Sequence, residues 1–456
     1  MIADSVCRDS AAVGRLTSNY AVHTGHTGHL CRARVPQLTA VYGNLAAGRL
    51  LHESVTSTAT TTASTAVAVP PRTGWHLPAM LALALGGFGI GTTEFVTMGL
   101  LPDIAGAFAV SEPTAGHAVS AYALGVVVGA PVIAAACAKV ARKRLLVVLM
   151  AAFAIGNLAS ALAPNFATMV AARFVSGLPH GAYFGVASLA AATLAPAGQR
   201  AKAVAAVMLG LSTANVVGVP AATWLGQHLG WRSAFVVVAV IGVATVAALL
   251  RFVPPLTAIV TTNPLTELGA LRRPQVLLTL AVGAIGFGGM FAVYTYVSTT
   301  LTDVAGMGAG LVPLVLALFG VGMVLGNIGG GVLADRGVDR SIFVALGAMT
   351  VVLLGFVAAA HNPITAGIGA LLVGATGAAL APGLQTRLMD VAADAQTLAA
   401  ALNHAALNIA NAAGAWLGGL VIAAGYGYTA PALVGAGLAA LGVALFTVTV
   451  WAAHRC

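Results

Sequence analysis

Long apolar runs dominate the sequence and limit what it can fold into. A helix needs roughly 20 mainly apolar residues to cross a bilayer. Only 7% of the residues are charged, against roughly 25% in soluble domains, so the chain cannot cover a water-soluble globule with polar surface. We therefore predict an all-α membrane protein with twelve transmembrane helices, at about residues 77–101, 115–137, 144–163, 166–191, 203–227, 233–251, 275–300, 308–333, 341–360, 364–387, 398–423 and 429–451.

A segment rich in Pro and Thr, residues 252–274, divides these spans into two groups of six. We expect an N-terminal half at 75–251, a cytoplasmic linker at 252–274 and a C-terminal half at 275–456. The halves resemble each other, since the tripeptide GFG occurs at 87–89 and again at 286–288. Half-to-half repeats are typical of secondary transporters, so we predict two six-helix pseudo-repeats.

The first 74 residues differ from the rest, being rich in His and Thr. They contain no apolar run long enough for the core of a signal peptide. We expect a disordered tail or an over-extended start of the reading frame, and we assign it no function. The cysteines are also uninformative, because Cys7, Cys31, Cys137 and Cys456 show no paired spacing; neither a structural disulfide nor a metal site is expected.

Positive charges gather in alternate loops. Arg142, Lys143 and Arg144 follow the second span, and Arg336 and Arg340 follow the eighth. Because cytoplasmic loops collect Lys and Arg, this pattern predicts that both termini are cytoplasmic. The net charge of +9 then reflects membrane topology, and no nucleic-acid partner is expected.

Two charged residues, Glu94 and Arg173, stand inside predicted spans one and four. A charge at the centre of a membrane helix costs at least about 2.5 kcal/mol and is kept mainly for a partner or a function. Each lies about seven residues from the outer end of its span, roughly 10 Å deep. We predict that the two face a shared polar interior and act in proton coupling, because burial and a nearby cation shift a carboxyl group's proton affinity in opposite directions. A static ion pair or a hydrogen bond between helices is the alternative.

Other polar and aromatic residues within the spans are candidates for lining a substrate cavity. His404, Asn408 and Asn411 fall on one face of span eleven by the i, i+4, i+7 rule. Polar residues in a span face the protein or a cavity, with plain helix packing as the alternative. The remaining candidates are His180, Tyr183, Asn215, Met290 and Tyr294. In span five, small residues and a proline are expected to allow close helix packing: Gly210, Gly218, Pro220 and Gly226.

Several stretches together resemble the major facilitator superfamily, in particular its drug:proton antiporter branch of the arabinose-efflux-permease type and the YdhP-like transporters, with chloramphenicol-efflux proteins more distant. These stretches include GTTEFVTMGLLPDIA, RFVSGLPHGAYFG and NVVGVPAATWLGQHLGWR, and the likeness covers roughly residues 77–452. The loop GGVLADRGVDR is similar to the superfamily's signature loop, which implies a gating role for Asp335, Arg336 and Arg340. The first copy has Ala138 in place of the expected aspartate but retains Arg142, Lys143 and Arg144, to which the resemblance extends the gating role. Plain positive-inside charge is the alternative for both copies.

This resemblance implies alternating access between the halves, with the proton gradient as driving force and no cofactor. We expect a proton-coupled exporter of a small organic molecule (a drug, sugar or metabolite) in a bacterial plasma membrane, working as a monomer with substrate, protons and the lipid bilayer as its partners. An uncoupled facilitator is the alternative, followed by a non-transporting sensor or scaffold. The sequence shows no P-loop, no GxSxG and no HExxH, so neither an ATP-driven pump nor an enzyme is expected.

Overall fold

The computed structural model describes residues 76–455, except 138–139, 197–198, 257–271 and 393–395. All regular structure in these residues is helical, which confirms the predicted fold class. Eleven of the described helical segments are long and apolar enough to cross a membrane. The predicted tail, and most of the predicted linker, lie outside the described residues.

The N-terminal half follows the predicted spans closely. Five spans are the helices α2 (Leu77–Gly99), α5 (His117–Ala136), α6 (Arg142–Ala161), α7 (Phe166–Leu194) and α10 (Arg232–Phe252). Span five comprises α8 (Arg200–Thr213), the π-helical turn η1 (Ala214–Gly218) and α9 (Val219–Leu229), and the short helices α3 (Leu101–Phe108) and α4 (Glu112–Ala115) join α2 to α5. With 29 residues α7 is long enough to span a membrane. It is not one of the eleven apolar segments, because its polar side chains lower its mean hydropathy.

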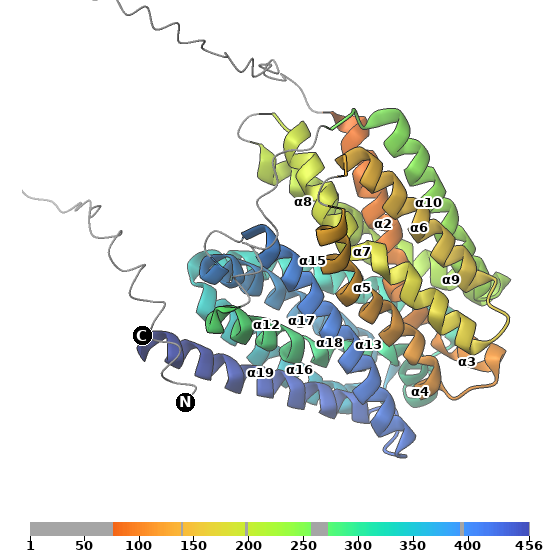
Figure 1. Ribbon diagram of the computed structural model, residues 1–456. Helices are drawn as coiled ribbons and strands as arrows, with labels where there is room; N and C mark the ends of the chain where they lie inside the picture. Colours follow the sequence, from red (N-terminus) through yellow and green to blue (C-terminus); the bar gives the residue numbers. More distant parts are fainter. Residues whose placement is uncertain (1–75, 138–139, 197–198, 257–271, 393–395, 456) are drawn as a thin grey trace, which may run out of the picture. The chain divides into compact units, whose positions relative to one another are not determined.

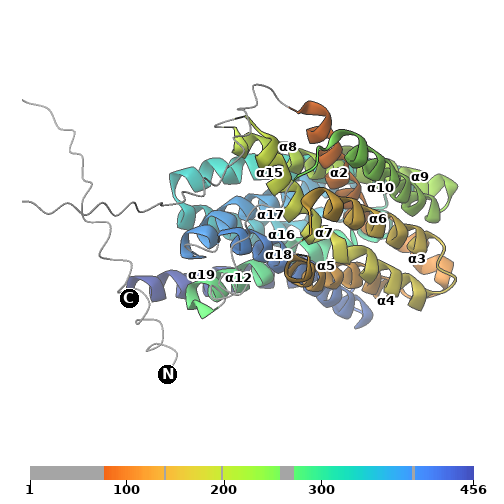
Figure 2. The same cartoon turned by 45° about the horizontal axis from the view of Figure 1, so that its top comes forward.

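The C-terminal half repeats this plan with one interrupted span. Span seven is divided into α12 (Pro274–Gly286), α13 (Gly288–Thr295), α14 (Val297–Thr299) and the π-helical turn η3 (Thr300–Val304). The short turn η4 (Ala309–Leu311) then leads into five long helices: α15 (Val312–Arg336), α16 (Val338–Ala359), α17 (Pro363–Ala392), α18 (Gln396–Ala423) and α19 (Ala430–Arg455). Figure 1 shows α2 to α10 in orange to green and α12 to α19 in green to blue, and the turned view in Figure 2 shows the same grouping.

The two prolines inside spans four and five have different consequences. Proline lacks an N–H and therefore removes one bond from the helical ladder. In span five the ladder widens to a π turn directly before Pro220, at Ala214–Gly218, and such turns are frequent at functional sites. In span four, α7 continues through Pro179 without ending.

Glycines set the closest helix contacts in both halves. On α15, a Cβ built at Gly326 would collide with the carbonyl oxygen of Ala375 on α17, and the glycines one turn away, Gly322 and Gly330, meet the same helix in the same way. Small residues permit such backbone approach between membrane helices.

The small residues of span five lie against α2 and the residue that follows it. Gly210 faces the backbone of Ala84, and Gly226 faces the side chain of Leu100. Gly218 faces the side chains of Thr92 and Phe88. Across the halves, α5 packs on α18, and α15 packs on η1 and α9. Residues from these contact regions, together with α2, α7 and α13, make up the site.

Candidate functional site at the junction of the two halves

Glu94 lies on α2, buried between the two halves with 7% of its surface exposed. Arg173 on α7 and Tyr122 on α5, both from its own half, act on it electrostatically. From the other half, Asn411 on α18 and Tyr294 on α13 approach the same carboxylate. Asn411 nevertheless makes no hydrogen bond of normal geometry with either side-chain polar atom. Glu94 is therefore a buried acid at the junction of the two halves, and residues of both halves surround it.

Arg173 is fully buried and is held by its own half. Its guanidinium donates to the hydroxyl of Thr93 at 3.0 Å and to the carbonyl of Thr93 at 3.1 Å. It also lies 4.2 Å from the ring centroid of Tyr122 and 5.5 Å from that of Phe235, within the range of a cation–π interaction. The Thr93 hydroxyl in turn donates to Asn157 on α6 at 2.5 Å. Helices α2, α5 and α10 thus contact the guanidinium directly, and α6 supports it through Thr93.

The two buried charges do not form a direct salt bridge. The one ion pair within the described ranges joins Arg387 to Asp339. Arg173 acts on Glu94 through space instead, from a position determined by Thr93, the residue next to Glu94. A through-space cation stabilises a carboxylate less than a contact pair does, because Coulomb energy falls with distance.

A second polar group continues from this cluster toward α18. The Tyr122 hydroxyl lies 3.1 Å from Nδ1 of His180. The His180 ring packs against Phe184 with a centroid distance of 5.4 Å, and Phe184 stacks on His404 of the other half at 6.0 Å with planes 4° apart. Side chains of α5, α7 and α18 therefore meet in one aromatic and polar column.

Several buried polar atoms near the junction have no hydrogen-bond partner in the part of the chain that the structure describes. They include both polar atoms of the Asn411 side chain, Oδ1 of Asn408 and Oδ1 of Asn215. Leaving a buried polar atom unpaired costs about 1–3 kcal/mol. A group of unpaired buried polar atoms is expected where water or a ligand completes the hydrogen bonds during function.

The other predicted cavity residues are distributed differently. Tyr183 is fully buried, and its hydroxyl donates to the carbonyl of Leu83 at 2.8 Å, so it serves the interior of the N-terminal half. Met290 is also fully buried and lies against Gly377 within the C-terminal half. These two side chains belong to packed cores, whereas Glu94, Tyr294 and Asn411 come together at the junction.

Sequence reasoning missed several contributors to this site. Asn157 carried a usable signal, because it is a lone amide in an apolar run and such residues face the protein interior. Tyr122 carried none beyond its residue type. Glu112 lies between the first and second predicted spans and carried no signal of its own, yet its carboxylate accepts a hydrogen bond from Thr299 of the other half.

Among the described residues, three hydrogen bonds cross between the halves, toward the end of the helices opposite the basic loops. Besides the bond of Thr299 to Glu112, the Ser120 hydroxyl donates to the carbonyl of Ala412 at 3.1 Å. Gln227 donates to the carbonyl of Ala309 at 3.2 Å. Tyr428 lies beside Glu112, and burial together with this carboxylate raises the pKa of Tyr428 to about 12, so it remains a neutral donor. The halves are joined at this end.

The predicted gating residues lie at the end of the helices that carries the basic loops. The ion pair at this end is formed by other residues. Asp335, Arg336 and Arg340 are exposed, with no ion pair among the described residues. The pair is formed by Asp339, in the first turn of α16, and Arg387 on α17. In the first loop copy, Arg142 donates to the Thr193 hydroxyl at 3.3 Å and Lys143 to the Leu250 carbonyl at 2.9 Å, while Arg144 is exposed.

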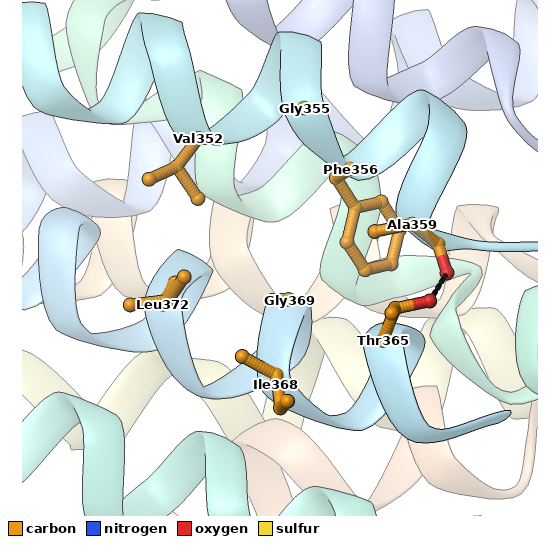
Figure 3. A pocket seen from close by; sticks show the side chains of 8 residues that line it. All are labelled: Val352, Gly355, Phe356, Ala359, Thr365, Ile368, Gly369 and Leu372. Carbon is orange, nitrogen blue, oxygen red and sulfur yellow. Dashed lines mark hydrogen bonds between the residues drawn. The ribbon is translucent and has the colours of Figure 1, made fainter. Parts of the chain in front are cut away.

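Figure 3 shows a different cavity, of about 260 Å³, between α16 and α17. Its lining is apolar except for Thr365, whose hydroxyl already donates to the carbonyl of Ala359 at 2.7 Å. Ile368 on its wall is largely exposed. No charged group lines it, so it offers no chemistry for a polar substrate.

Two helical halves with a buried polar cluster at their junction define a membrane transporter that is built from repeats. The family model described as Major Facilitator Superfamily matches residues 83–392 and 310–455. The chain therefore belongs to the major facilitator superfamily, and it is a multi-pass membrane transporter and not an enzyme.

Individual relatives agree with this assignment. The chain is 43% identical to the inner membrane transport protein YdhP of Escherichia coli strain K12, over 80% of this chain and 94% of that protein. It is 36% identical to a chloramphenicol resistance protein of Streptomyces lividans, over 73% and 86%. Among solved structures, a D-xylose–proton symporter matches with a TM-score of 0.68 at 16% identity, covering 82% of this chain and 97% of the symporter. That last likeness concerns the fold alone.

Proposed function

We propose that the protein exports a small organic molecule from a bacterial cell across the plasma membrane, and that protons entering the cell drive this export. The observation that carries the proposal is the position of Glu94, a buried acid without a salt bridge that residues of both halves surround. An acid at such a junction changes its surroundings when the halves move. Its proton affinity then differs between the two states, which coupling requires.

The arrangement of the halves supports alternating access. The hydrogen bonds between them lie toward the end opposite the basic loops. Because Lys and Arg collect in cytoplasmic loops, we assign the basic end and both termini to the cytoplasm. In this orientation the joined end faces outward, so the halves would separate there to release a substrate.

The unpartnered amides indicate the kind of substrate. Asn411, Asn408 and Asn215 offer donors and acceptors, and Phe184 with Tyr294 adds aromatic surface. This combination suits a neutral, partly apolar molecule with hydroxyl or amide groups. The relative named for chloramphenicol resistance makes chloramphenicol the first compound to test.

The test is flux in proteoliposomes, with and without an imposed pH gradient, normalised to inserted protein. We expect wild-type protein to move a substrate uphill when the gradient is present. Glu94→Gln should abolish uphill transport while it still permits exchange of substrate down its gradient, since the amide keeps the shape but cannot titrate. Asp103→Asn is the matched control, because this exposed acid lies beyond the end of α2.

Two outcomes distinguish the alternatives. Uphill transport by Glu94→Gln at the wild-type rate would show that this residue does not couple protons. Wild-type flux that never exceeds equilibration, at any gradient, would instead favour an uncoupled facilitator.

A further inference from the structure

A second cavity, of about 430 Å³, lies at the end of the helices that carries the basic loops. Its walls come from the start of α6, the end of α10 and the residues that follow α10. The lining residues are Ala141, Lys143, Arg144, Val147, Leu250, Pro255 and Leu256. Lys143 and Arg144 therefore contribute to a cavity whose walls are almost entirely hydrocarbon, which fits a ligand that has an apolar chain and, beside it, an anionic group for the two cations.

The cations at this cavity lack a counter-charge among the described residues. Lys143 donates to the Leu250 carbonyl at 2.9 Å, and Arg144 is exposed without a hydrogen bond or ion pair. With Arg142, they occupy the first turn of α6, which contains no acid and has no side-chain cap. Cations are unfavourable at this end of a helix because the dipole is positive there. An anion in the cavity would relieve the repulsion.

The first turn of α6 and the first turn of its counterpart in the C-terminal half differ in charge. The corresponding helix, α16, begins with Val338, Asp339 and Arg340, where α6 begins with Arg142, Lys143 and Arg144. The first turn of α16 thus contains an acid, Asp339, which pairs with Arg387. In one half the helix start supplies its own acid, whereas in the other half the helix start holds only cations beside an open cavity.

We propose that this cavity binds one anionic phospholipid of the surrounding membrane. Its phosphate would lie between Lys143 and Arg144, and an acyl chain would follow Val147 and Leu256. The apolar wall favours a lipid over free phosphate, and Leu250, 56% exposed, continues this wall toward the membrane. Basic pockets between helices at a membrane surface bind anionic headgroups. This proposal does not depend on the transported substrate or on proton coupling.

The experiment measures lipid binding to the purified full chain by native mass spectrometry, with phosphatidylglycerol and phosphatidylcholine titrated separately. We expect one phosphatidylglycerol to bind more tightly than phosphatidylcholine. Each cation near a membrane surface contributes about 1 kcal/mol, or roughly fivefold in affinity, so Lys143→Gln with Arg144→Gln should weaken phosphatidylglycerol binding about 25-fold. The control is the equally charged double variant Arg336→Gln with Arg340→Gln, which should bind as the wild type does.

Three results would overturn the proposal. They are equal affinity for the two lipids, equal weakening in the control variant, and displacement of the lipid by millimolar inorganic phosphate, which would identify free phosphate as the ligand. If the double variant does not fold, Val147→Trp tests the same site, because it fills the apolar wall and keeps both cations. Retention of phosphatidylglycerol by a folded Val147→Trp would likewise refute the assignment.

Discussion

Arg173 should be the main polar anchor of the N-terminal half, and its replacement tests how the buried charges are held. Arg173→Ala removes two hydrogen bonds to Thr93 and the contact with the Tyr122 ring. Arg173→Lys keeps the charge but loses the planar fork that reaches both Thr93 oxygens. Thr93→Val removes one acceptor and the link to Asn157. Thr92→Val is the matched control, because the Thr92 hydroxyl bonds only within its own helix, to Phe88 at 2.8 Å.

The magnitudes follow from these contacts. Removing one member of a buried charged network costs about 3–5 kcal/mol, which we expect for Arg173→Ala. A hydrogen bond to a charged group contributes about 1.5–3 kcal/mol, which sets the loss for Arg173→Lys. For Thr93→Val we expect about 1–2 kcal/mol, since the carbonyl of residue 93 still accepts one bond. Thr92→Val should stay close to the wild type.

The assay is thermal unfolding of the detergent-purified proteins at a fixed scan rate, because such unfolding is commonly irreversible and its midpoint depends on the rate. The expected order of midpoints is Arg173→Ala, Arg173→Lys, Thr93→Val and then Thr92→Val, from lowest to highest. Equal midpoints for Arg173→Ala and Thr92→Val would refute the anchoring role. If Glu94→Gln lowered the midpoint as much as Arg173→Ala, the acid would be the main partner of Arg173 instead.

Three further predictions concern packing, closure and topology. Gly326→Ala should destabilise the protein by about 1–3 kcal/mol through overpacking, while Gly329→Ala, with open space at its Cβ, should not; thermal midpoints of the two decide this. Thr299→Val removes the bond to Glu112, so hydrogen exchange in α4 and η3 should quicken about tenfold at constant global stability; unchanged exchange would argue against a latch. A reporter protein fused near Asp303 should report a position outside the cytoplasm, and a cytoplasmic signal there would contradict the proposed membrane orientation.

The sequence predicted the helical spans because each span is encoded by one continuous run of mainly apolar residues. The runs placed α2 and α16 within a few residues of their observed bounds. Counting residues along spans one and four also put Glu94 and Arg173 at one depth, since helical rise per residue is constant. No comparable rule predicts the orientation of the Arg173 guanidinium. Its contacts with Thr93 and Tyr122 depend on how α2, α5 and α7 pack.

The features that the sequence did not predict arise from contacts distant in the chain. Asp339 and Arg387 are 48 residues apart, and nothing local marks them as partners. Glu112 and Thr299 are 187 residues apart and belong to different halves. The division of span seven at Phe287 and Tyr296 is likewise not predictable locally, because no proline stands at either break. Such pairings are fixed by tertiary packing, which periodicity does not encode.

The two buried charges differ in a way that bears on the proposed transport cycle. Among the described residues, the hydrogen bonds and cation–π contacts of the Arg173 guanidinium all lie within its own half, with Thr93, Tyr122 and Phe235. A movement of one half against the other therefore leaves this cation in place. Glu94 instead faces Asn411 of the opposite half, so the same movement changes its surroundings.

A fixed cation and an acid with a changing neighbour are the parts that a proton-coupled cycle needs. The cation keeps the carboxylate from becoming too costly to ionise, while the approach or departure of the opposite half alters how well the acid is solvated. Only the second effect can couple proton binding to movement, because a ligand shifts a conformational equilibrium solely through its different affinity for the two states. Under the proposed function, the coupling should therefore depend on residue 411 as well as on residue 94. Asn411→Leu should shift the pH dependence of uphill flux while leaving Arg173 anchored, and an unchanged pH profile would remove the opposite half from the mechanism.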